Sequence, residues 1–109
     1  MTGRSEKFLS DIKAAIDLID DFLAPIEDFN EYVNDKKTQS AVERQLAIMG
    51  EAVNQYEKHN PEHSLTHAAQ IISLRNRLIH AYDAVDNAII WTIVKNHLAP
   101  LKQEVEEKL

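Results

Sequence analysis

Apolar residues recur at intervals of three and four along almost the whole chain, and this spacing constrains the fold more than any other feature. At about 100° per residue, residues spaced in this way form one stripe along an α-helix. The first stripe runs through Phe8, Ile12, Ala15, Ile16, Ile19, Phe22, Leu23 and Ile26. The 109 residues include only two glycines and three prolines, whereas an all-β chain needs many turn residues. The sequence therefore predicts an all-α protein.

Three helices are expected in the first half of the chain. The first follows Ser5, a suitable N-cap, and ends near Pro25. A short helix over about 26–33 follows, with Ile26, Phe29 and Val33 turned inward. Residues 34–35 (Asn-Asp) are typical of a turn or a helix cap. The third helix, over about 36–56, has an apolar face made of Val42, Leu46, Met49, Val53 and Tyr56.

A glycine interrupts the edge of that third apolar face. Gly50 lies in the middle of the predicted helix, where a glycine costs up to about 1 kcal/mol relative to alanine. Close approach by another backbone would explain why a glycine is used here.

Two further helices are expected after the break at residues 60–61 (Asn-Pro). Ser64 is a suitable N-cap for a helix over about 65–80. A fifth helix, capped by Asp83 or Asp86, is expected to continue to about residue 105 and to bend at Pro100.

Length and composition favour one compact domain over residues 1–109. The hydrophobic share of 44% is too high for a disordered chain, and no cysteine is present for a disulfide, a thiol nucleophile or a thiolate metal site. No segment approaches the roughly 18 uncharged apolar residues of a membrane span, and no signal-peptide core is visible. We expect a four- to five-helix up-and-down bundle, cytoplasmic and without membrane contact.

The net charge of −6 is unevenly distributed along the chain. A protein that coats nucleic acid normally carries the opposite sign. The segment 63–82, however, contains two arginines and no acid, a charge of +2, so the remainder carries −8. The overall charge thus excludes a nucleic-acid coat, but it does not exclude a protein that holds one or two phosphates.

Arg75 lies in the middle of the apolar stripe of the fourth predicted helix. The stripe is formed by Ile71, Ile72, Leu74, Leu78 and Ile79. Because a guanidinium stays charged at accessible pH, an inward-turned Arg75 must be paired or must line a cleft or subunit interface. The alternatives are a structural acid such as Glu51 as its partner, or an extended side chain that reaches the rim.

Asn76 and His80 lie one helical turn apart at the border of the same face. With Arg75 they place a fixed cation, an amide and an imidazole within about two turns. Such a set can orient a phosphate, stabilise an anionic transition state and move a proton near pH 7. For each residue taken alone, a structural role is the alternative.

The other histidines give a weaker signal. His59, His63 and His67 have the spacing of metal ligands on a helix, but Pro61 interrupts the first interval and no third ligand is apparent. We therefore expect no metal and no cofactor. His97 falls on the apolar face of the fifth helix and is expected to be packed and hydrogen-bonded, with Trp91 packing beside it at the bundle or dimer surface.

The segment Arg75-Asn-Arg-Leu-Ile-His80-Ala-Tyr82 resembles the Arg-x4-His-x-Tyr motif of HepT-like proteins of the HEPN superfamily. Segments 41–52 and 83–91 resemble the same family, and the resemblance covers nearly the whole chain. It implies a homodimeric, metal-independent endoribonuclease that is the toxin of a toxin–antitoxin system. In that family the motifs of two subunits face each other across a shared cleft. The resemblance makes Arg75 and His80 the catalytic pair that acts on RNA, with Asn76 in support.

The resemblance also implies a protein partner, an MntA-like nucleotidyltransferase antitoxin. In the family this antitoxin silences the toxin by AMPylation of the motif tyrosine, which matches Tyr82. This chain has no glycine-rich phosphate loop, so nucleotide chemistry would belong to the partner. The alternative is a non-catalytic helical subunit that binds a nucleotidyltransferase and presents Tyr82 or a substrate to it.

Overall fold

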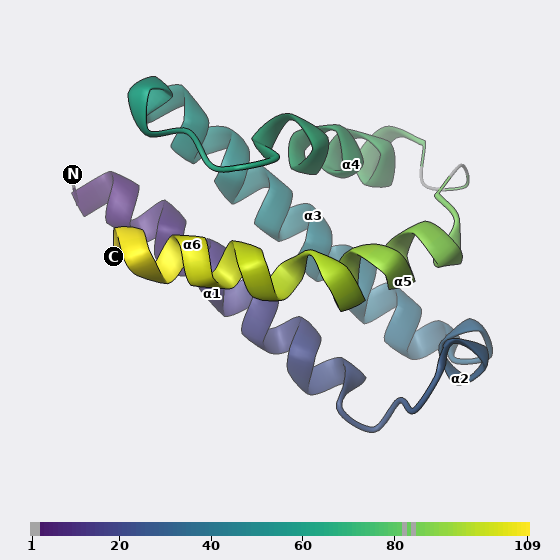
Figure 1. Cartoon of the computed structure of the whole chain (residues 1–109). Helices are drawn as coiled ribbons and strands as arrows, with labels where there is room; N and C mark the ends of the chain where they lie inside the picture. The colour runs from purple at the N-terminus through teal and green to yellow at the C-terminus, as the bar shows by residue number, and fades with distance from the viewer. Residues whose placement is uncertain (1–2, 82, 84) are drawn as a thin grey trace.

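The computed structural model describes residues 3–81, 83 and 85–109. Among these residues no strand occurs, which confirms the prediction of an all-α protein. The elements are α1 (Gly3–Leu23), α2 (Phe29–Val33), α3 (Lys36–His59), the 3-10 turn η1 (Pro61–His63), α4 (Ala68–His80), α5 (Asn87–Asn96) and α6 (Leu98–Lys108) (Figure 1).

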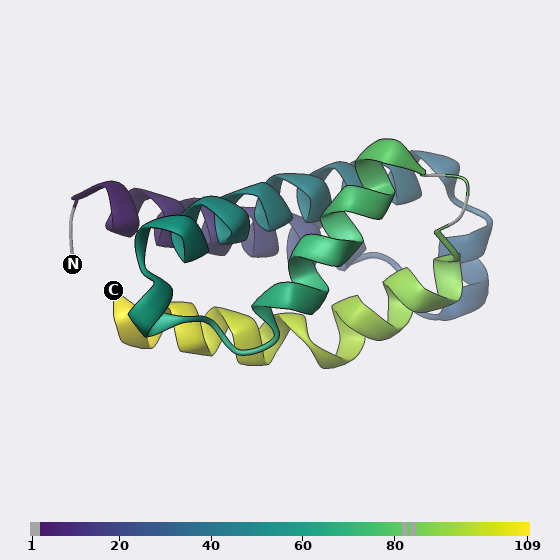
Figure 2. The same cartoon turned by 90° about the horizontal axis from the view of Figure 1, so that it is seen from above.

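Successive long helices run up and down past one another. α1 and α3 pack along their length, α6 packs against α1, and α4 packs against α3. The start of α1 and the end of α6 lie at the same end of the molecule (Figure 1). Figure 2 shows α4 slanting across the bundle, from the side of α6 toward α3. The expected up-and-down bundle is therefore confirmed, with α5 and α6 together forming its last limb.

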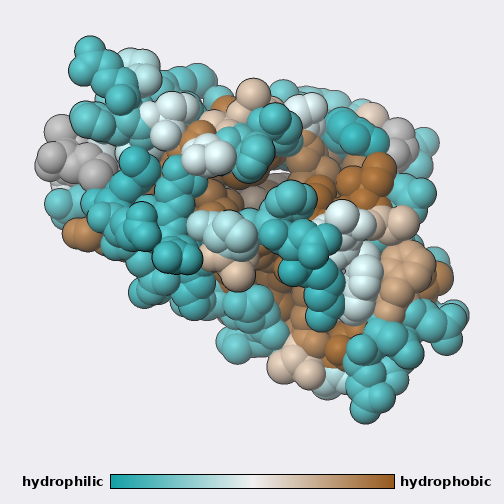
Figure 3. Space-filling view, in the orientation of Figure 1, coloured by the Kyte–Doolittle hydropathy of each residue, from teal (hydrophilic) through white to brown (hydrophobic). Residues whose placement is uncertain are grey.

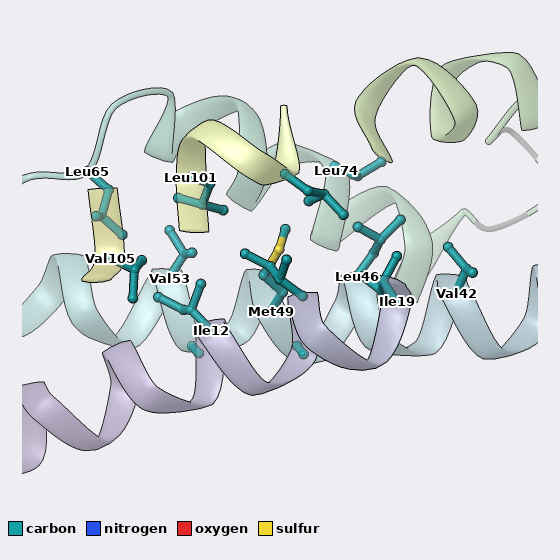
Figure 4. Packing of buried hydrophobic residues seen from close by; sticks show 14 of the residues in the cluster. Ile12, Ile19, Val42, Leu46, Met49, Val53, Leu65, Leu74, Leu101 and Val105 are labelled. Carbon is teal, nitrogen blue, oxygen red and sulfur yellow. The ribbon is translucent and has the colours of Figure 1, made fainter. Parts of the chain in front are cut away.

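The core lies where α1, α3 and α6 meet, and α4 covers part of it (Figure 4). The predicted inward face of α3 is confirmed, because Val42, Leu46, Met49, Val53 and Tyr56 are all buried. None of the described helices is long and apolar enough to cross a membrane.

Two of the predicted helix caps are correct and two are wrong. Asp35 accepts a 3.0 Å hydrogen bond from the Thr38 N–H at the start of α3, and Asp86 caps α5 through the Ala88 N–H at 2.7 Å. Ser5 is instead a buried residue inside α1, where its hydroxyl accepts from Asn60 Nδ2 at 2.8 Å.

Ser64 is also not the cap of α4. Its hydroxyl donates to the carboxylate of Glu57, and α4 begins only after His67, which has a left-handed backbone (φ 62°). Both serines therefore bond to groups on α3 or at its end, and these tertiary contacts replace the local capping that the sequence predicts.

The last two expectations about elements need correction. On α2 the buried residue is Tyr32, while Phe29 and Val33 remain more than one-third exposed. The predicted fifth helix is divided at His97, not at Pro100. Pro100 lies in the first turn of α6, where a missing N–H costs no intrahelical bond. His97 is exposed and not packed in the core, and its ring lies 6.3 Å from that of His67.

Candidate active site

Gly50 lets α4 approach α3 at the position of Arg75. A Cβ atom at position 50 would lie 2.3 Å from Arg75 Cβ, 2.9 Å from Arg75 Cγ and 3.4 Å from the Ile71 carbonyl oxygen. Real Cβ atoms essentially never lie within 3.0 Å of such neighbours. A close approach at Gly50 is therefore confirmed, but its nearest atoms are the side-chain Cβ and Cγ of Arg75 and not backbone atoms. The nearest backbone atom is the Ile71 carbonyl oxygen.

Arg75 is paired with Glu51. Of the two alternatives predicted for its surroundings, the acidic partner is therefore the one observed. Arg75 NH2 lies 2.6 Å from Glu51 Oε2, and Arg75 NH1 donates to Asn76 Oδ1 at 2.8 Å. Gln55 Nε2 donates to the other Glu51 oxygen at 2.9 Å. Gln55 is not among the residues predicted for this site, although its spacing of four from Glu51 on α3 is the spacing of side chains that meet.

The pair lies in a shallow hollow of about 370 Å³ between α3 and α4. The hollow is lined by Glu43, Arg44, Ala47, Ile48, Glu51, Arg75, Leu78 and Ile79. Ile48 is 38% exposed and Ile79 47% exposed, so apolar side chains border a charged centre. Burial raises the pKa of Glu43 above its usual range. A guanidinium in such a hollow can bind an anion, and the apolar border suits contact with a second protein surface.

His80 and Asn76 lie beside this hollow and do not line it. His80 is the exposed last residue of α4, and Asn76 is exposed one turn earlier. Residues five apart on a helix point to different faces, so Arg75 and His80 of one subunit do not converge on the hollow. Asn76 contacts the Arg75 guanidinium and lies on the same face as His80. Tyr82 lies outside the described residues.

A comparison with protein families matches residues 12–107 to the model described as "Ribonuclease HepT-like". This chain belongs to the HepT-like family. The match includes the hollow, Asn76 and His80, so the resemblance carried by the Arg-x4-His-x-Tyr motif is confirmed at the level of the family.

Several relatives resemble this HepT-like chain over most of its length. A protein of Thermococcus cleftensis named "Probable ribonuclease HepT" is 40% identical over 109 residues, covering 95% of this chain and 96% of its own. A protein of Methanocaldococcus jannaschii with a provisional RNase name is 36% identical, covering 97% of this chain and 98% of its own. A relative in Caldanaerobacter subterraneus, also provisionally named an RNase, is 35% identical over 82 residues, 74% of this chain and 73% of its own. No solved structure gives a significant match.

The remaining histidines of this HepT-like chain lie apart from the hollow. His59 contacts the Gln55 carbonyl oxygen through Nδ1 at 2.8 Å and Arg4 NH1 through Nε2 at 3.1 Å. His63 is exposed in η1. Within the described ranges, no three His, Cys, Asp or Glu side chains are grouped so that they could hold a metal ion.

Trp91 packs against other helices of the same chain. Of the two positions predicted for it, at the surface of the bundle or of the dimer, these contacts fit the first. Its ring lies 5.5 Å from that of Tyr32 and 6.0 Å from that of Phe29, and Lys95 Nζ lies 4.6 Å from its centre. These contacts join α2 to α5 and help to bury Tyr32. None of these contacts of Trp91 involves Arg75, Asn76 or His80.

A second, larger hollow of about 630 Å³ lies between α4 and the α5–α6 limb. Figure 3 shows apolar side chains exposed inside it. Met49, Leu74, Leu98 and Leu101 are among its lining residues, and no lysine or arginine of the described chain lines it. Two histidines, His67 and His97, also line this hollow, but it holds no permanently charged cation such as Arg75. The hollow at Arg75 is therefore the candidate site of this HepT-like chain.

Proposed function

We propose that this chain is a metal-independent endoribonuclease, the toxin of a toxin–antitoxin system, with Arg75 and His80 as its catalytic residues. The observation that carries the proposal is the guanidinium of Arg75, held at the surface by Glu51 and Asn76 in a chain of a ribonuclease family. A fixed cation that faces a hollow is the group that phosphoryl chemistry needs most.

In the proposed reaction, RNA supplies its own nucleophile. The 2′-oxygen attacks the adjacent phosphorus, the bond from phosphorus to the 5′-oxygen breaks, and the products are a 2′,3′-cyclic phosphate and a 5′-hydroxyl. One imidazole takes the proton of the 2′-hydroxyl, and the leaving oxygen receives a proton from a second acid. Arg75 donates hydrogen bonds to the phosphorane oxygens as their negative charge grows.

We propose that two subunits build this site together. Because Arg75 and His80 of one subunit point to different faces of α4, His80 of one subunit would act beside Arg75 of the other. Ile48 and Ile79 would be covered at the junction. Mixing an Arg75→Ala protein with a His80→Ala protein then restores up to about a quarter of the activity, because half of the dimers are mixed and each has one intact site. A mixture as inactive as either variant alone would contradict a shared site.

We propose that an MntA-like nucleotidyltransferase silences the enzyme by AMPylation of Tyr82. AMP attached two residues from His80 adds bulk and negative charge, which competes with RNA phosphate for Arg75. After incubation with a cognate nucleotidyltransferase and ATP, the intact mass of the chain should rise in AMP increments. A Tyr82→Phe protein that gains the same increments would refute the assignment of Tyr82.

Expression of the wild type and of His80→Ala, each without a partner, tests the function in cells. The proposal predicts arrested growth and fragmented RNA with the wild type only. Equal growth and intact RNA in both cultures would refute the nuclease function. RNA fragmentation by both proteins would refute the role of His80.

The second candidate is a non-catalytic subunit that binds a nucleotidyltransferase and presents Tyr82 or a substrate to it. The observation in its favour is the carboxylate of Glu51, which offsets the charge of the arginine that would bind phosphate. This candidate predicts binding to the nucleotidyltransferase without any RNA cleavage by the isolated chain.

A further inference from the structure

The guanidinium of Arg75 belongs to a chain of four polar side chains on two helices. Gln55 contacts Glu51, Glu51 contacts Arg75, and Arg75 contacts Asn76, at distances between 2.6 and 2.9 Å. Gly50 provides the space for this arrangement, since any larger residue would meet the base of the arginine. The orientation of the guanidinium is therefore set by α3 as well as by its own helix.

The Glu51–Arg75 contact adds little to the stability of the fold. The Glu51 side chain is 42% exposed and that of Arg75 is 23% exposed, and ion pairs at such exposure contribute little to stability because of solvent screening and side-chain entropy. The contact has a larger effect on electrostatics, because a carboxylate 2.6 Å from the guanidinium offsets its charge. A phosphate that approaches Arg75 meets a cation whose field is already partly cancelled.

The hydrogen-bond donors of Arg75 determine how a phosphate could bind. A guanidinium has five N–H donors. One donor on NH1 is used by Asn76, and NH2 faces Glu51. Nε is buried and has no partner among the described residues. The remaining N–H groups of NH1 and NH2 are therefore the ones that a phosphate in the hollow would reach.

We infer that Glu51 is a positioning residue that orients Arg75 and also weakens its attraction for phosphate. This inference rests on the proposed function and adds a control of RNA affinity to it. The two effects are separable by substitution. Glu51→Gln keeps a side chain of the same shape but removes the negative charge. Its one oxygen can face Arg75, and its amide N–H can donate to the Gln55 side-chain oxygen once the Gln55 amide is turned over. Glu51→Ala removes both the charge and the orientation.

Initial rates of cleavage of an RNA oligonucleotide, measured against RNA concentration, test the inference on the purified full chain. For Glu51→Gln we expect KM to fall about tenfold, with kcat within about threefold of the wild type. For Glu51→Ala we expect kcat to fall at least about tenfold. Both variants should melt within a few degrees of the wild type.

The matched control is Asp17→Asn, which removes one charge from another surface ion pair. Asp17 lies 2.6 Å from Lys102 Nζ and its side chain is 46% exposed, close to the values for Glu51. Asp17 does not line the hollow, so its substitution should leave KM unchanged. An equal fall of KM in Asp17→Asn and Glu51→Gln would overturn the inference, because the effect would then depend on net charge alone.

Failure of the inference is distinguishable from failure of the proposed function. If the wild type cleaves RNA and Glu51→Gln shows an unchanged or raised KM, Glu51 does not compete with phosphate, and the ribonuclease function stands. If the wild type does not cleave RNA, the proposed function fails. Binding of a non-cleavable 2′-deoxy oligonucleotide gives a readout without catalysis, for which we expect about tenfold tighter binding by Glu51→Gln. Equal binding by the two proteins would overturn the inference.

Discussion

Replacement of Gly50 by alanine should loosen the contact between α3 and α4 and destabilise the protein. The new Cβ atom would lie 2.3 Å from Arg75 Cβ, about 1 Å short of the 3.4–4 Å of ordinary van der Waals contact. Both of these Cβ atoms are attached directly to a helix backbone, so a side-chain rotation cannot separate them. One of the two helices must therefore move. Overpacking of this kind costs about 1–3 kcal/mol.

The gain in helix propensity opposes this cost. Alanine is favoured over glycine in a helix interior by about 1 kcal/mol, and α3 surrounds position 50 on both sides. The two terms together leave a net loss of up to about 2 kcal/mol in the free energy of unfolding. Such a loss lowers the melting temperature by up to about 10 °C. The rate of RNA cleavage should also fall, at temperatures where the variant is still folded, because the atoms that must shift carry the guanidinium of Arg75.

Thermal and urea unfolding followed by circular dichroism measure the stability term, with the slope m as a check on two-state behaviour. Gly3→Ala is the matched control, since nothing lies within 4 Å of a Cβ built at Gly3 in the first turn of α1. Its melting temperature should equal or slightly exceed that of the wild type. If Gly50→Ala melts at or above the wild type and keeps its activity, the close approach of α4 to α3 is not what position 50 requires.

Three further substitutions test other parts of the structure. Tyr32→Phe should melt at or above the wild-type temperature, because the buried Tyr32 hydroxyl has no partner among the described residues and burial raises its pKa; a loss above about 1 kcal/mol would reveal a missing partner. Burial raises the pKa of the half-buried Glu43, so its ionisation makes stability fall as pH rises through that pKa. Glu43→Gln should therefore stabilise the fold at pH 7 and not below about pH 4; equal stability of the two proteins at pH 7 would contradict the raised pKa. Ile79→Glu should yield monomers in light scattering without unfolding, whereas Leu18→Glu, an exposed apolar residue of α1, should not; unchanged dimers in Ile79→Glu would exclude this face.

The long elements of the fold could be predicted because their signals are local and repeated. α3 has five apolar positions on one face and an aspartate that reaches Thr38 at its start. α2 could not be predicted in the same way, since a five-residue helix is too short for a period of 3.6 to identify its inward face. Its buried residue, Tyr32, is selected by stacking against Trp91, which is distant in sequence.

The site was predictable in its residue types and not in its geometry. Arg75 within an apolar stripe required a partner, a cleft or a rim position, and the choice depended on how α4 crosses α3. That crossing is set by Gly50, whose role appears only when the two helices are placed together. Ser5 and Ser64 show the same limit, because each hydroxyl bonds to a group that the sequence pattern does not identify.

Cleavage of a defined RNA by the purified protein tests the central claim most directly. The substrate is compared with one that carries a single 2′-deoxy nucleotide at the cleaved position, and the wild type is compared with His80→Ala in the presence of EDTA. We predict that the wild type cuts the RNA and leaves 2′,3′-cyclic phosphate ends, while the deoxy substrate and the His80→Ala reaction show no cut at that position. Cleavage of the deoxy substrate, or equal cleavage by His80→Ala, would contradict the account.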